Sequence, residues 1–312
     1  MTRSPALPAV GAPSSGGRGA HPRRRGVRGW QAWLFAGPSL AIILVFIVFP
    51  IAQSFWFSLH DWRIGADVQQ WLGLANYERL FGDERFWNAA RVTAVFALVS
   101  VVLQLLLGFG AASALQGESL LTRAVRSVLF FPTIVALATI GLVWRFLLDP
   151  NIGLVAGISE TLGLPAVGWL QDPALALPTL IFVSVWKNVG FTMVILLAGL
   201  KGVPAELYEA ARLDGASKAR ITWSVTLPSI RPTLLFTTMI LTINSFQVFD
   251  LVYVMTKGGP LFATDTLVTM MFREGFQNFD LGYASAIAWV LFFFIMLLSA
   301  LQLRLFRYDD VD

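Results

Sequence analysis

The chain has 312 residues, of which 56% are hydrophobic and 13% are charged, whereas an ordinary soluble domain has roughly 45–50% apolar and about 25% charged residues; this balance argues against a water-soluble globule. Because cysteine is absent and the two histidines, His21 and His60, lie far apart, we expect no disulfide, no metal site and no cofactor. The net charge is +4. A nucleic-acid-binding protein needs basic residues gathered on one exposed face. The placement of the basic residues in this chain does not indicate such a face, so we expect no nucleic-acid partner.

Residues 1–29 form the first predicted segment. They consist mainly of Gly, Ser, Pro, Ala and Arg, with hardly any large apolar side chain, so they cannot bury enough surface to fold. We expect a flexible, basic, cytoplasmic tail. The apolar stretch that follows is longer than the roughly 7–15 residues of a signal-peptide core, and it is therefore expected to remain as the first membrane span.

Six apolar windows are long enough to cross about 30 Å of hydrocarbon, which takes about 20 helical residues. Only Lys187 and Asp250 place a charge well inside a window. Continuous apolarity without alternation favours helices over barrel strands. We therefore predict an all-α integral membrane protein with a six-helix transmembrane bundle. The windows are 34–57, 92–114, 125–147, 176–200, 233–255 and 284–305.

Lysine and arginine concentrate in alternate segments between these windows, where one set holds roughly twice as many as the other. The richer set comprises the N-terminal tail, the segments after the second and fourth windows, and the C-terminal end. Because cytoplasmic loops retain positive charge during insertion, both termini are predicted to lie inside. The outer segments are then 58–91, 148–175 and 256–283. The first is rich in aromatic residues, which suits either helices that cap the bundle or a docking surface.

The segment 201–232, between the fourth and fifth windows, has the signals of a helix-turn-helix. Pro204 suits the first turn of a helix, and Glu206 complements the positive end of its dipole. Gly215 suits the left-handed position that ends such a helix. A second short helix is predicted to run from about residue 217 and to end before Pro228. The residues leave open whether this hairpin docks on a partner or lies unpartnered at the membrane surface.

Polar residues inside the fourth and fifth windows indicate a solute path. Lys187 lies roughly 20 Å from the inner end of its span at 1.5 Å per residue, and Asn244 lies at a similar depth on the next. Charges at such depth usually face protein or water, which predicts a polar cavity. An ion pair between Lys187 and Asp250 that only joins two helices is the alternative. The predicted path residues are Lys187, Asn188, Asn244, Gln247, Phe249, Asp250 and Tyr253.

These side chains suit a sugar, since amides and carboxylates bind hydroxyl groups and aromatic rings cover the apolar ring faces. On a continuous helix they do not share one face. Phe249, Asp250 and Tyr253 would form one stripe, together with Phe246, and Asn244 would lie on an adjacent stripe. The residues leave open which stripe faces the lumen, and whether this subunit or a partner holds the solute.

The hairpin segment also carries a family pattern. Its Glu-Ala-Ala, Asp-Gly-Ala and Leu-Pro groups, with Pro232 after them, resemble the EAA loop of permease subunits of bacterial binding-protein-dependent ABC importers. Val225 stands where isoleucine is usual in that family. The resemblance implies that the loop is a coupling helix that docks in a cleft of the ATP-binding subunit. The coupling residues are then Glu206, Glu209, Ala210, Ala211, Asp214, Gly215, Ala216, Leu227 and Pro228.

Further stretches, including 249–256 and 282–285, resemble the carbohydrate-uptake branch of this family, whose members import oligosaccharides, monosaccharides or glycerol-3-phosphate. The resemblance covers about residues 30–308, which would form the permease domain. It implies a location in the bacterial inner membrane among its lipids, and three partners: a second homologous permease, a dimer of ATP-binding subunits and an extracytoplasmic solute-binding protein. The loop expected to contact the binding protein contains Lys257, Gly258, Gly259 and Pro260.

No catalytic signature accompanies these features. The chain has no Gly-Lys dipeptide, which a phosphate-binding P-loop requires, and no visible general base or nucleophile. We therefore expect a non-catalytic permease, with ATP hydrolysis on a separate subunit. Two alternatives are a secondary solute transporter, which would need coupling-ion sites and an inverted repeat, and a non-transporting membrane scaffold, which would not account for the EAA hairpin.

The charge asymmetry predicts that the 256–283 loop faces outward. A cysteine introduced at position 262 should react with a membrane-impermeant thiol reagent added to the outside of intact cells, and the label is specific because the native chain has no cysteine. If that cysteine reacts only from the cytoplasmic side, the six-span topology is wrong.

Overall fold

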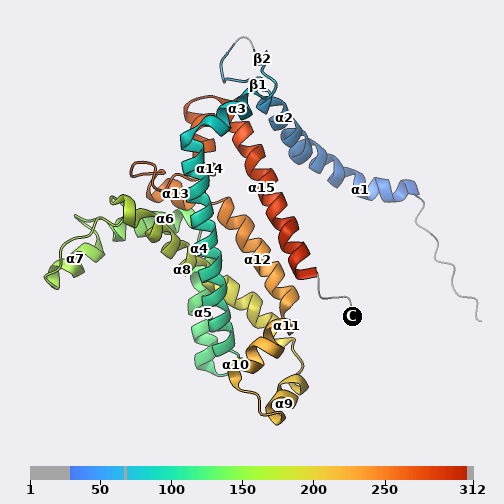
Figure 1. Cartoon of the computed structure of the whole chain (residues 1–312), viewed down its shortest axis with the longest axis vertical. Helices are drawn as coiled ribbons and strands as arrows, with labels where there is room; N and C mark the ends of the chain where they lie inside the picture. Colours follow the sequence, from blue (N-terminus) through green and yellow to red (C-terminus); the bar gives the residue numbers. More distant parts are fainter. Residues whose placement is uncertain (1–28, 67–68, 308–312) are drawn as a thin grey trace, which may run out of the picture. The chain divides into compact units, whose positions relative to one another are not determined.

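The computed structural model describes residues 29–66 and 69–307. The chain divides into two compact units, 1–51 and 52–312. The described part of the first unit belongs to the helical run drawn in blue in Figure 1, within which Ala36–Ser58 is long and apolar enough to cross a membrane. Apart from Gly29, the predicted tail lies outside the described residues. The elements of this run are α1 (Gly29–Ile43), the π-helical turn η1 (Leu44–Val48) and α2 (Phe49–Ser58).

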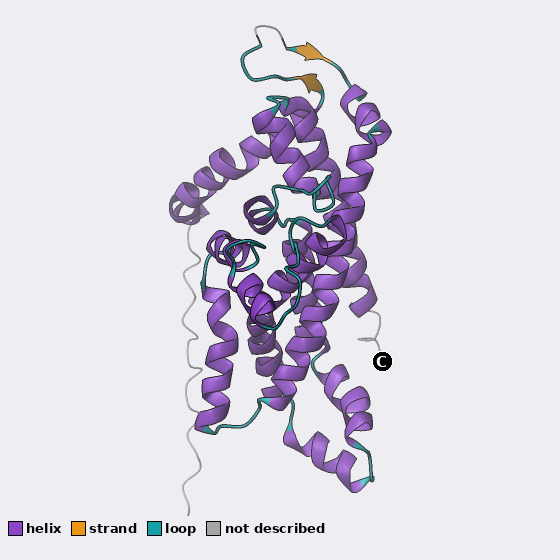
Figure 2. Cartoon of the chain, turned by 90° about the vertical axis from the view of Figure 1, so that its left-hand side faces the viewer, coloured by secondary structure: helices purple, strands orange, loops and turns teal. Residues whose placement is uncertain are grey.

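The second unit is a helical bundle, seen from two sides in Figures 1 and 2. Four long helices dominate it: α4 packs along α8 and α12, and α15 packs against α12. Helix α5 also packs along α8. The helices up to α8 are α3 (Ala75–Gly82), α4 (Glu84–Ala114), α5 (Leu120–Ile134), α6 (Leu137–Leu147), α7 (Leu154–Thr161) and α8 (Pro173–Lys201). Those after the hairpin are α12 (Arg231–Phe246), α13 (Asp250–Met255), α14 (Leu267–Phe272), the π-helical turn η3 (Arg273–Gln277) and α15 (Leu281–Arg307).

Buried apolar clusters hold these helices together at three levels of the described bundle. One joins α3, α4, α14 and α15 through residues such as Met270 and Ile287. The next joins α4, α6, α8 and α13 around Phe96 and Leu251. The last lies near the hairpin and contains Met193 of α8. Because the apolar contact is spread along the full length of α4 and α8, these two helices form the rigid centre of the unit.

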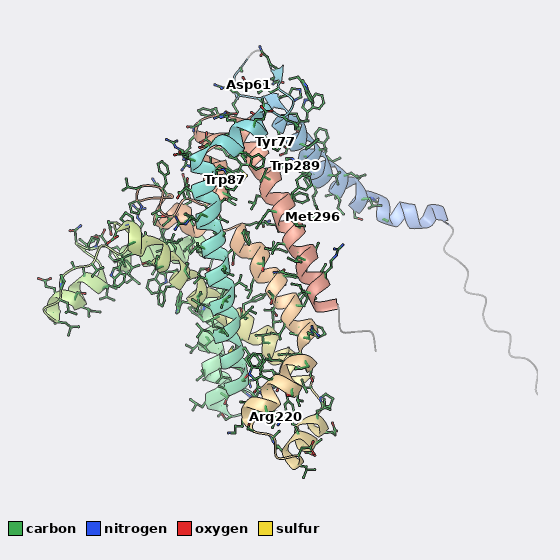
Figure 3. All side chains as sticks on the ribbon, in the orientation of Figure 1. Asp61, Tyr77, Trp87, Arg220, Trp289 and Met296 are labelled. Atoms are coloured by element: carbon green, nitrogen blue, oxygen red, sulfur yellow. The ribbon has the colours of Figure 1, made fainter. Side chains whose placement is uncertain are left out.

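The aromatic-rich segment 58–91 covers one end of the bundle. It contains an antiparallel strand pair, β1 (His60–Asp61) and β2 (Gln70–Trp71), in which His60 pairs with Trp71. Helix α3 packs on α15, and the Asn76 amide donates to the carbonyls of Ser58 and His60. Figure 3 shows Asp61 at this end and Arg220 at the opposite end. The segment thus packs on the bundle, as in the capping alternative, rather than standing free of it.

The third predicted span is not one straight helix. Five described helices are long and apolar enough to cross a membrane, and a sixth span is obtained only if α5 and α6 count together, although they are bent by 98°. Val135 leaves the helical conformation, with φ −76° and ψ 139°, and Ala136 follows it with φ −58° and ψ 139°. Two successive extended residues end α5 and redirect the chain. The expectation of a continuous helix over 125–147 is therefore wrong.

The fifth span is also interrupted. Helix α12 ends at Phe246 and α13 begins at Asp250, with Phe249 at φ −132° and ψ −61° between them. The argument from a continuous helical phase, which separated Phe249 and Asp250 from Asn244, therefore fails. Once a helix is broken, the side chains on either side no longer follow one 3.6-residue period.

Helices α5 and α8 are in close backbone contact at Gly190. A Cβ built at this glycine would lie 2.1 Å from the carbonyl oxygen of Leu129, which is far inside van der Waals contact. Backbone therefore packs on backbone here, and only glycine fits without a shift of α5. This contact holds the end of α5 beside Lys187, one turn earlier on α8.

Replacing Gly190 by alanine should lower the stability of the fold by about 1–3 kcal/mol, because the added methyl overpacks the α5–α8 contact. Gly110→Ala is the matched control, since Gly110 lies inside α4 and a Cβ there meets nothing within 4 Å. That control should gain about 0.5–1 kcal/mol of stability from helix propensity. Thermal unfolding of the two purified variants measures the difference, and equal shifts of the same sign would contradict the packing argument.

Candidate functional site

A polar cavity of about 250 Å³ lies where α4, α8 and the α12–α13 break meet. Six of the seven predicted path residues line it, and they come from two different spans. Tyr253 is the exception: it is not among the lining residues, and its ring stacks on Phe249 with the ring centroids 5.2 Å apart. The six that line the cavity are Lys187, Asn188, Asn244, Gln247, Phe249 and Asp250.

The break between α12 and α13 brings the polar side chains of this segment together. Asn244 lies in the last turn of α12, Gln247 follows it, and Asp250 begins α13. All three side chains are exposed to the cavity. Phe246 turns away instead, is buried, and packs on Phe294 with centroids 5.2 Å apart. The arrangement gives the cavity two amides and a carboxylate on one wall.

Lys187 makes two hydrogen bonds with Thr133 at the end of α5. Its ammonium donates a hydrogen bond to the carbonyl of Thr133 over 3.3 Å, and the Thr133 hydroxyl donates to the Lys187 carbonyl over 3.0 Å. Thr133 lies in the last turn of α5, where carbonyl groups lack a helical partner. Lys187 thus caps the broken helix while lining the cavity. Among the described residues, the alternative ion pair between Lys187 and Asp250 is not formed.

Ser245 of α12, beside the predicted Asn244, also lines the cavity, and so do two polar residues that the sequence reasoning missed: Gln104 of α4 and Ser184 of α8. The search for charges inside apolar windows passed over them because they are uncharged. Gln104 did carry a usable signal, since an amide in the middle of a membrane span must find a polar surrounding. Besides Phe249, the apolar part of the lining is Phe96, Leu137, Phe191, Leu241 and Val248.

The predicted hairpin is present at the other end of the bundle, with two differences in its boundaries. Helix α9 (Ala205–Leu213) begins after Pro204, which is the N-cap residue rather than part of the first turn. Gly215 has a φ of 74°, as its predicted left-handed role requires, and the Ala216 N–H closes the helix end on the Ala211 carbonyl over 3.0 Å. The turn is therefore built as the sequence indicated.

The second helix of the hairpin does not end before Pro228. It starts as α10 (Lys218–Ile221), capped by Ser217, continues through the π-helical turn η2 (Thr222–Thr226), and ends as α11 (Leu227–Ser229), which contains Pro228. Pro228 lies just after the π-helical turn, where the regular hydrogen-bond pattern of the α-helix is already interrupted, so its missing N–H is tolerated there. The helical run therefore extends two residues beyond Leu227.

Most of the predicted coupling residues lie on the surface of the hairpin. Ala211, Ala216 and Leu227 are half-buried, and the exposed ones are Glu206, Glu209, Ala210, Asp214, Gly215 and Pro228. The structure adds two large apolar side chains beside them: Leu213 is 89% exposed and Trp223 is 74% exposed. Exposed apolar side chains of this size mark a surface that contacts either another protein or the membrane. The sequence reasoning had not selected either residue.

Glu209 also faces inward. It lines a cavity of about 670 Å³ between the hairpin and the end of α4, where Phe109 and Ser113 form the facing wall. An ion pair between Glu118, after α4, and Lys201, the last residue of α8, lies at the root of the hairpin. The hydrogen bond from Lys201 lowers the pKa of Glu118, so the pair persists until the pH falls through that lowered value.

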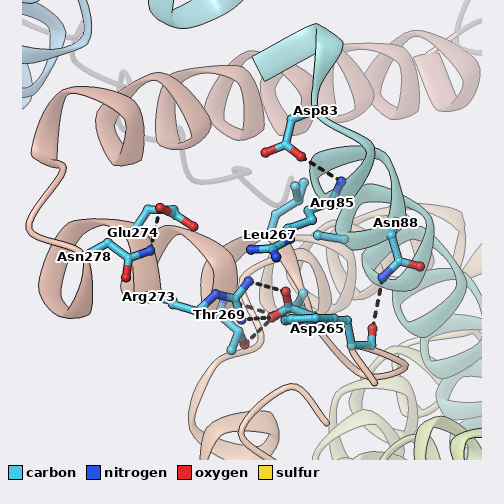
Figure 4. A network of polar contacts seen from close by, with 12 residues as sticks. Asp83, Arg85, Asn88, Asp265, Leu267, Thr269, Arg273, Glu274 and Asn278 are labelled. Atoms are coloured by element: carbon cyan, nitrogen blue, oxygen red, sulfur yellow. Dashed lines mark hydrogen bonds and ion pairs between the residues drawn. The ribbon is translucent and has the colours of Figure 1, made fainter. Parts of the chain in front are cut away.

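The loop after α13, in which Lys257 to Pro260 were predicted to contact a binding protein, is anchored by a buried ion pair (Figure 4). Asp265 accepts two hydrogen bonds from Arg273, over 3.1 and 2.5 Å. Burial raises the pKa of Asp265, although Arg273 opposes the shift. Lys257 and Gly258 have φ values of 53° and 87°, and the neighbouring Leu261 is 86% exposed. The loop thus has a fixed base and an exposed tip.

A second contact ties this loop to α4. Asn88 donates to the carbonyl of Phe262 over 3.0 Å, and the Thr93 hydroxyl accepts the Leu267 N–H over 2.9 Å, at the start of α14 (Figure 4). Because α4 also lines the polar cavity through Gln104, the loop and the cavity share one rigid helix.

Comparison with known proteins relates this architecture to one family. The family described as "Binding-protein-dependent transport system inner membrane component" matches residues 104–309. The diacetylchitobiose uptake system permease protein NgcF of Streptomyces coelicolor is 36% identical over 305 residues, which are 93% of this chain and 86% of that protein. The trehalose/maltose transport system permease protein MalF of Thermococcus litoralis is 35% identical over 280 residues, covering 88% and 93%.

A solved structure shares the fold. It is a bacterial ABC transporter involved in the import of the acidic polysaccharide alginate, which superposes with a TM-score of 0.77 at 23% sequence identity and covers 90% of this chain and 96% of that chain. At this identity the likeness concerns the arrangement of the helices alone.

Proposed function

The chain belongs to the family of binding-protein-dependent transport system inner membrane components, and we propose that it is the permease through which an ATP-driven importer moves a carbohydrate. It is a multi-pass inner-membrane protein of the ABC-importer type. The relatives that carry diacetylchitobiose or trehalose and maltose support a sugar as the solute. We propose residues 30–308 as the permease domain, with both termini in the cytoplasm.

The observation that carries this proposal is the polar cavity at the α12–α13 break. Charged and amide side chains in a membrane span are costly unless they face protein or water, and here Lys187, Asn244 and Asp250 face one cavity. Their hydrogen-bonding groups suit sugar hydroxyls, and the Phe249 ring suits an apolar sugar face. Tyr253 would support that ring from behind, since it stacks on Phe249.

The partners follow from the two ends of the bundle. We propose that the hairpin, residues 201–232, docks on one subunit of an ATP-binding dimer, which supplies the hydrolysis. Leu213 and Trp223, both exposed, would add apolar contact to this interface. At the opposite end, the anchored loop that begins at Lys257 would receive the external solute-binding protein. We also propose that a second, homologous permease completes the path.

Two other functions fit less well. A secondary transporter would need an ion-coupling site, and the cavity offers one carboxylate, Asp250, without a cluster of further acids. A membrane scaffold would have no use for a polar cavity inside its spans. Purification separates these functions from the proposed one, because a tagged ABC permease should retain an ATP-binding subunit, whereas a secondary carrier should drive uptake alone.

Leucine in place of Asn244 or Gln247 should raise the half-saturating solute concentration about tenfold, or abolish uptake, because each loses about one hydrogen bond to the solute. The measurement is the concentration dependence of labelled-sugar uptake by cells that produce the complete transporter. Thr238→Val on the same helix is the control: its hydroxyl bonds only the Leu234 carbonyl, and uptake should keep its concentration dependence. Variants that only lower the amount of assembled complex would argue for a structural role instead.

Gly215→Val and Glu209→Lys should uncouple the transporter. Valine resists the φ of 74° at Gly215, and lysine opposes the helix dipole and any basic partner group near Glu209. The expected complex either loses its ATP-binding subunit or hydrolyses ATP without moving solute. The ratio of hydrolysis to uptake in reconstituted vesicles measures this effect.

The matched control is Gly163→Val. Gly163 has a φ of 69° and, like Gly215, open space around a built Cβ, but it lies after α7, away from the hairpin. Both valine variants should therefore lose similar stability, by about 1–2 kcal/mol, while only the change at Gly215 alters coupling. A Gly215→Val, Glu209→Lys double variant that hydrolyses ATP and transports at the parental ratio would rule out this loop as the coupling element.

A further inference from the structure

An exposed apolar stripe runs along α7, the helix inside the segment 148–175 that the sequence placed outside the membrane. Leu154, Ile158 and Leu162 are each more than half exposed, and their spacing of four residues puts them on one side of the helix. Helix α7 packs against α6, and Figure 1 shows it at the far end of a lobe that projects from the long helices. A helix side that faces water normally carries polar residues, so the stripe indicates an apolar surrounding.

The helices before α7 place this lobe at the depth of the lipid. Helix α5 packs along the membrane span α8, but it has only 15 residues and therefore rises about 22 Å, less than the roughly 30 Å of a bilayer core. Helix α6 continues at 98° to α5, so it runs across the bilayer instead of leaving it. Its Leu142, Val143 and Phe146 are more than half exposed, which suits contact with lipid chains.

An apolar groove of about 490 Å³ lies between α6, α7 and α8. Trp144, Val155 and Phe182 line it from these three helices, and none of the described residues that line it is charged. The hydroxyl of Thr179, also in the groove, is already satisfied by the carbonyl of Leu175 over 2.8 Å. Water would find few hydrogen-bond partners there. The volume lies within the roughly 300–1,000 Å³ of common ligand pockets, so an apolar ligand fits the groove.

The α8 wall of the groove lies at the outer boundary of the hydrocarbon. Lys201, the last residue of α8, pairs with Glu118 at the inner end of the span. Counted from Lys201 at 1.5 Å per residue, Phe182 lies about 28 Å and Thr179 about 33 Å along the helix, on either side of the roughly 30 Å bilayer core. Tryptophan is enriched at this boundary, and Trp169 lines the groove. Because a membrane span forms one wall, the groove is continuous with the lipid-facing side of α8.

The charges of the lobe favour a lipid without net charge. Residues 148–175 contain three acidic and no basic residues. Two of the acids hold the local backbone: Asp149 accepts the N–H of Asn151, and Asp172 accepts the N–H of Ala174. The lobe therefore has no basic side chain that could hold an anionic head group.

We infer that α7 lies in the outer leaflet, with its stripe of Leu154, Ile158 and Leu162 toward the lipid chains, and that the adjacent groove binds an acyl chain of a zwitterionic phospholipid. The segment 148–175 is then a membrane-surface element and not a free outer loop. The inference requires only that the chain spans the membrane, so it does not depend on which solute is moved.

Nitroxide labels on single cysteines test the placement of α7 in the complete transporter with cysteine-free partner subunits, since this chain has no cysteine of its own. The label replaces Ile158 of the stripe or, as the matched control, Glu160, which is exposed on the opposite side of α7. In phosphatidylcholine vesicles, the label at position 158 should collide more often with oxygen, which dissolves in hydrocarbon, than with a water-soluble nickel chelate. At position 160 this ratio should be reversed, because that side faces head groups and water.

Two results at position 158 overturn the inference. Frequent collisions with the nickel chelate mean that the stripe faces water. Few collisions with either reagent mean that protein covers the stripe, such as a second permease or the solute-binding protein. Because Ile158 is exposed, its replacement should leave the fold intact, and labels at positions 154 and 162 should repeat the excess of oxygen collisions.

Lipid retention tests the groove. Val155→Trp fills it with a larger side chain, and Leu142→Trp is the matched control, since Leu142 is exposed on α6 but does not line the groove. The complete transporter is equilibrated with equal amounts of phosphatidylcholine and phosphatidylglycerol and purified in detergent, and native mass spectrometry counts the phospholipids that stay bound. The Val155→Trp complex should retain one phosphatidylcholine fewer per copy of this permease, and the Leu142→Trp complex should retain the parental number.

Equal retention in the two tryptophan variants, or loss of phosphatidylglycerol in place of phosphatidylcholine, overturns the groove as the site of a zwitterionic lipid. Val155→Phe, which adds less volume, gives the same measurement if the complex with tryptophan does not assemble.

Discussion

The structure depends on one constraint of the bilayer: every backbone N–H and C=O inside the hydrocarbon must be satisfied within the protein. Two spans depart from a continuous helix, at α5–α6 and at α12–α13. The first departure frees the carbonyl of Thr133, and Lys187 satisfies it. The second exposes Gln247 and Asp250 to a cavity. In both places the irregular backbone lies where protein or a polar space can satisfy its unpaired N–H and C=O groups. Both helix breaks lie beside the same polar cavity.

Helices α8 and α12 connect the cavity to the hairpin. Helix α8 carries Ser184 and Lys187 at the cavity and ends at Lys201, where the ion pair with Glu118 holds the root of the hairpin. Helix α12 starts directly after the hairpin and ends at the α12–α13 break. Helices transmit displacement along their axes with little loss, because each turn is hydrogen-bonded to the next. If the hairpin couples to an ATP-binding subunit as proposed, α8 and α12 are the helices that connect it to two walls of the cavity.

Several features could be read from the sequence because they depend on local chemistry. Gly215 was expected in the left-handed conformation because glycine tolerates it, and the span positions follow from uncharged apolar length. The proximity of Lys187 to Asn244 followed from the rise per residue of two neighbouring helices. The end of the second hairpin helix was placed too early, since proline was taken as a stop although the helical run continues past it after a π-helical turn.

What the sequence by itself determined is therefore the class of the protein, its apolar spans, and the chemical character of the residues placed deep in them. Only the tertiary structure decided which of these residues meet. The breaks at Val135 and Phe249 interrupt the helical period, so it no longer predicts which residues share a face. Gln104, Ser184 and Ser245 come together from three helices that are far apart in the chain. Such meetings arise from long-range packing, such as backbone on backbone at Gly190, and no periodicity within a single segment encodes them.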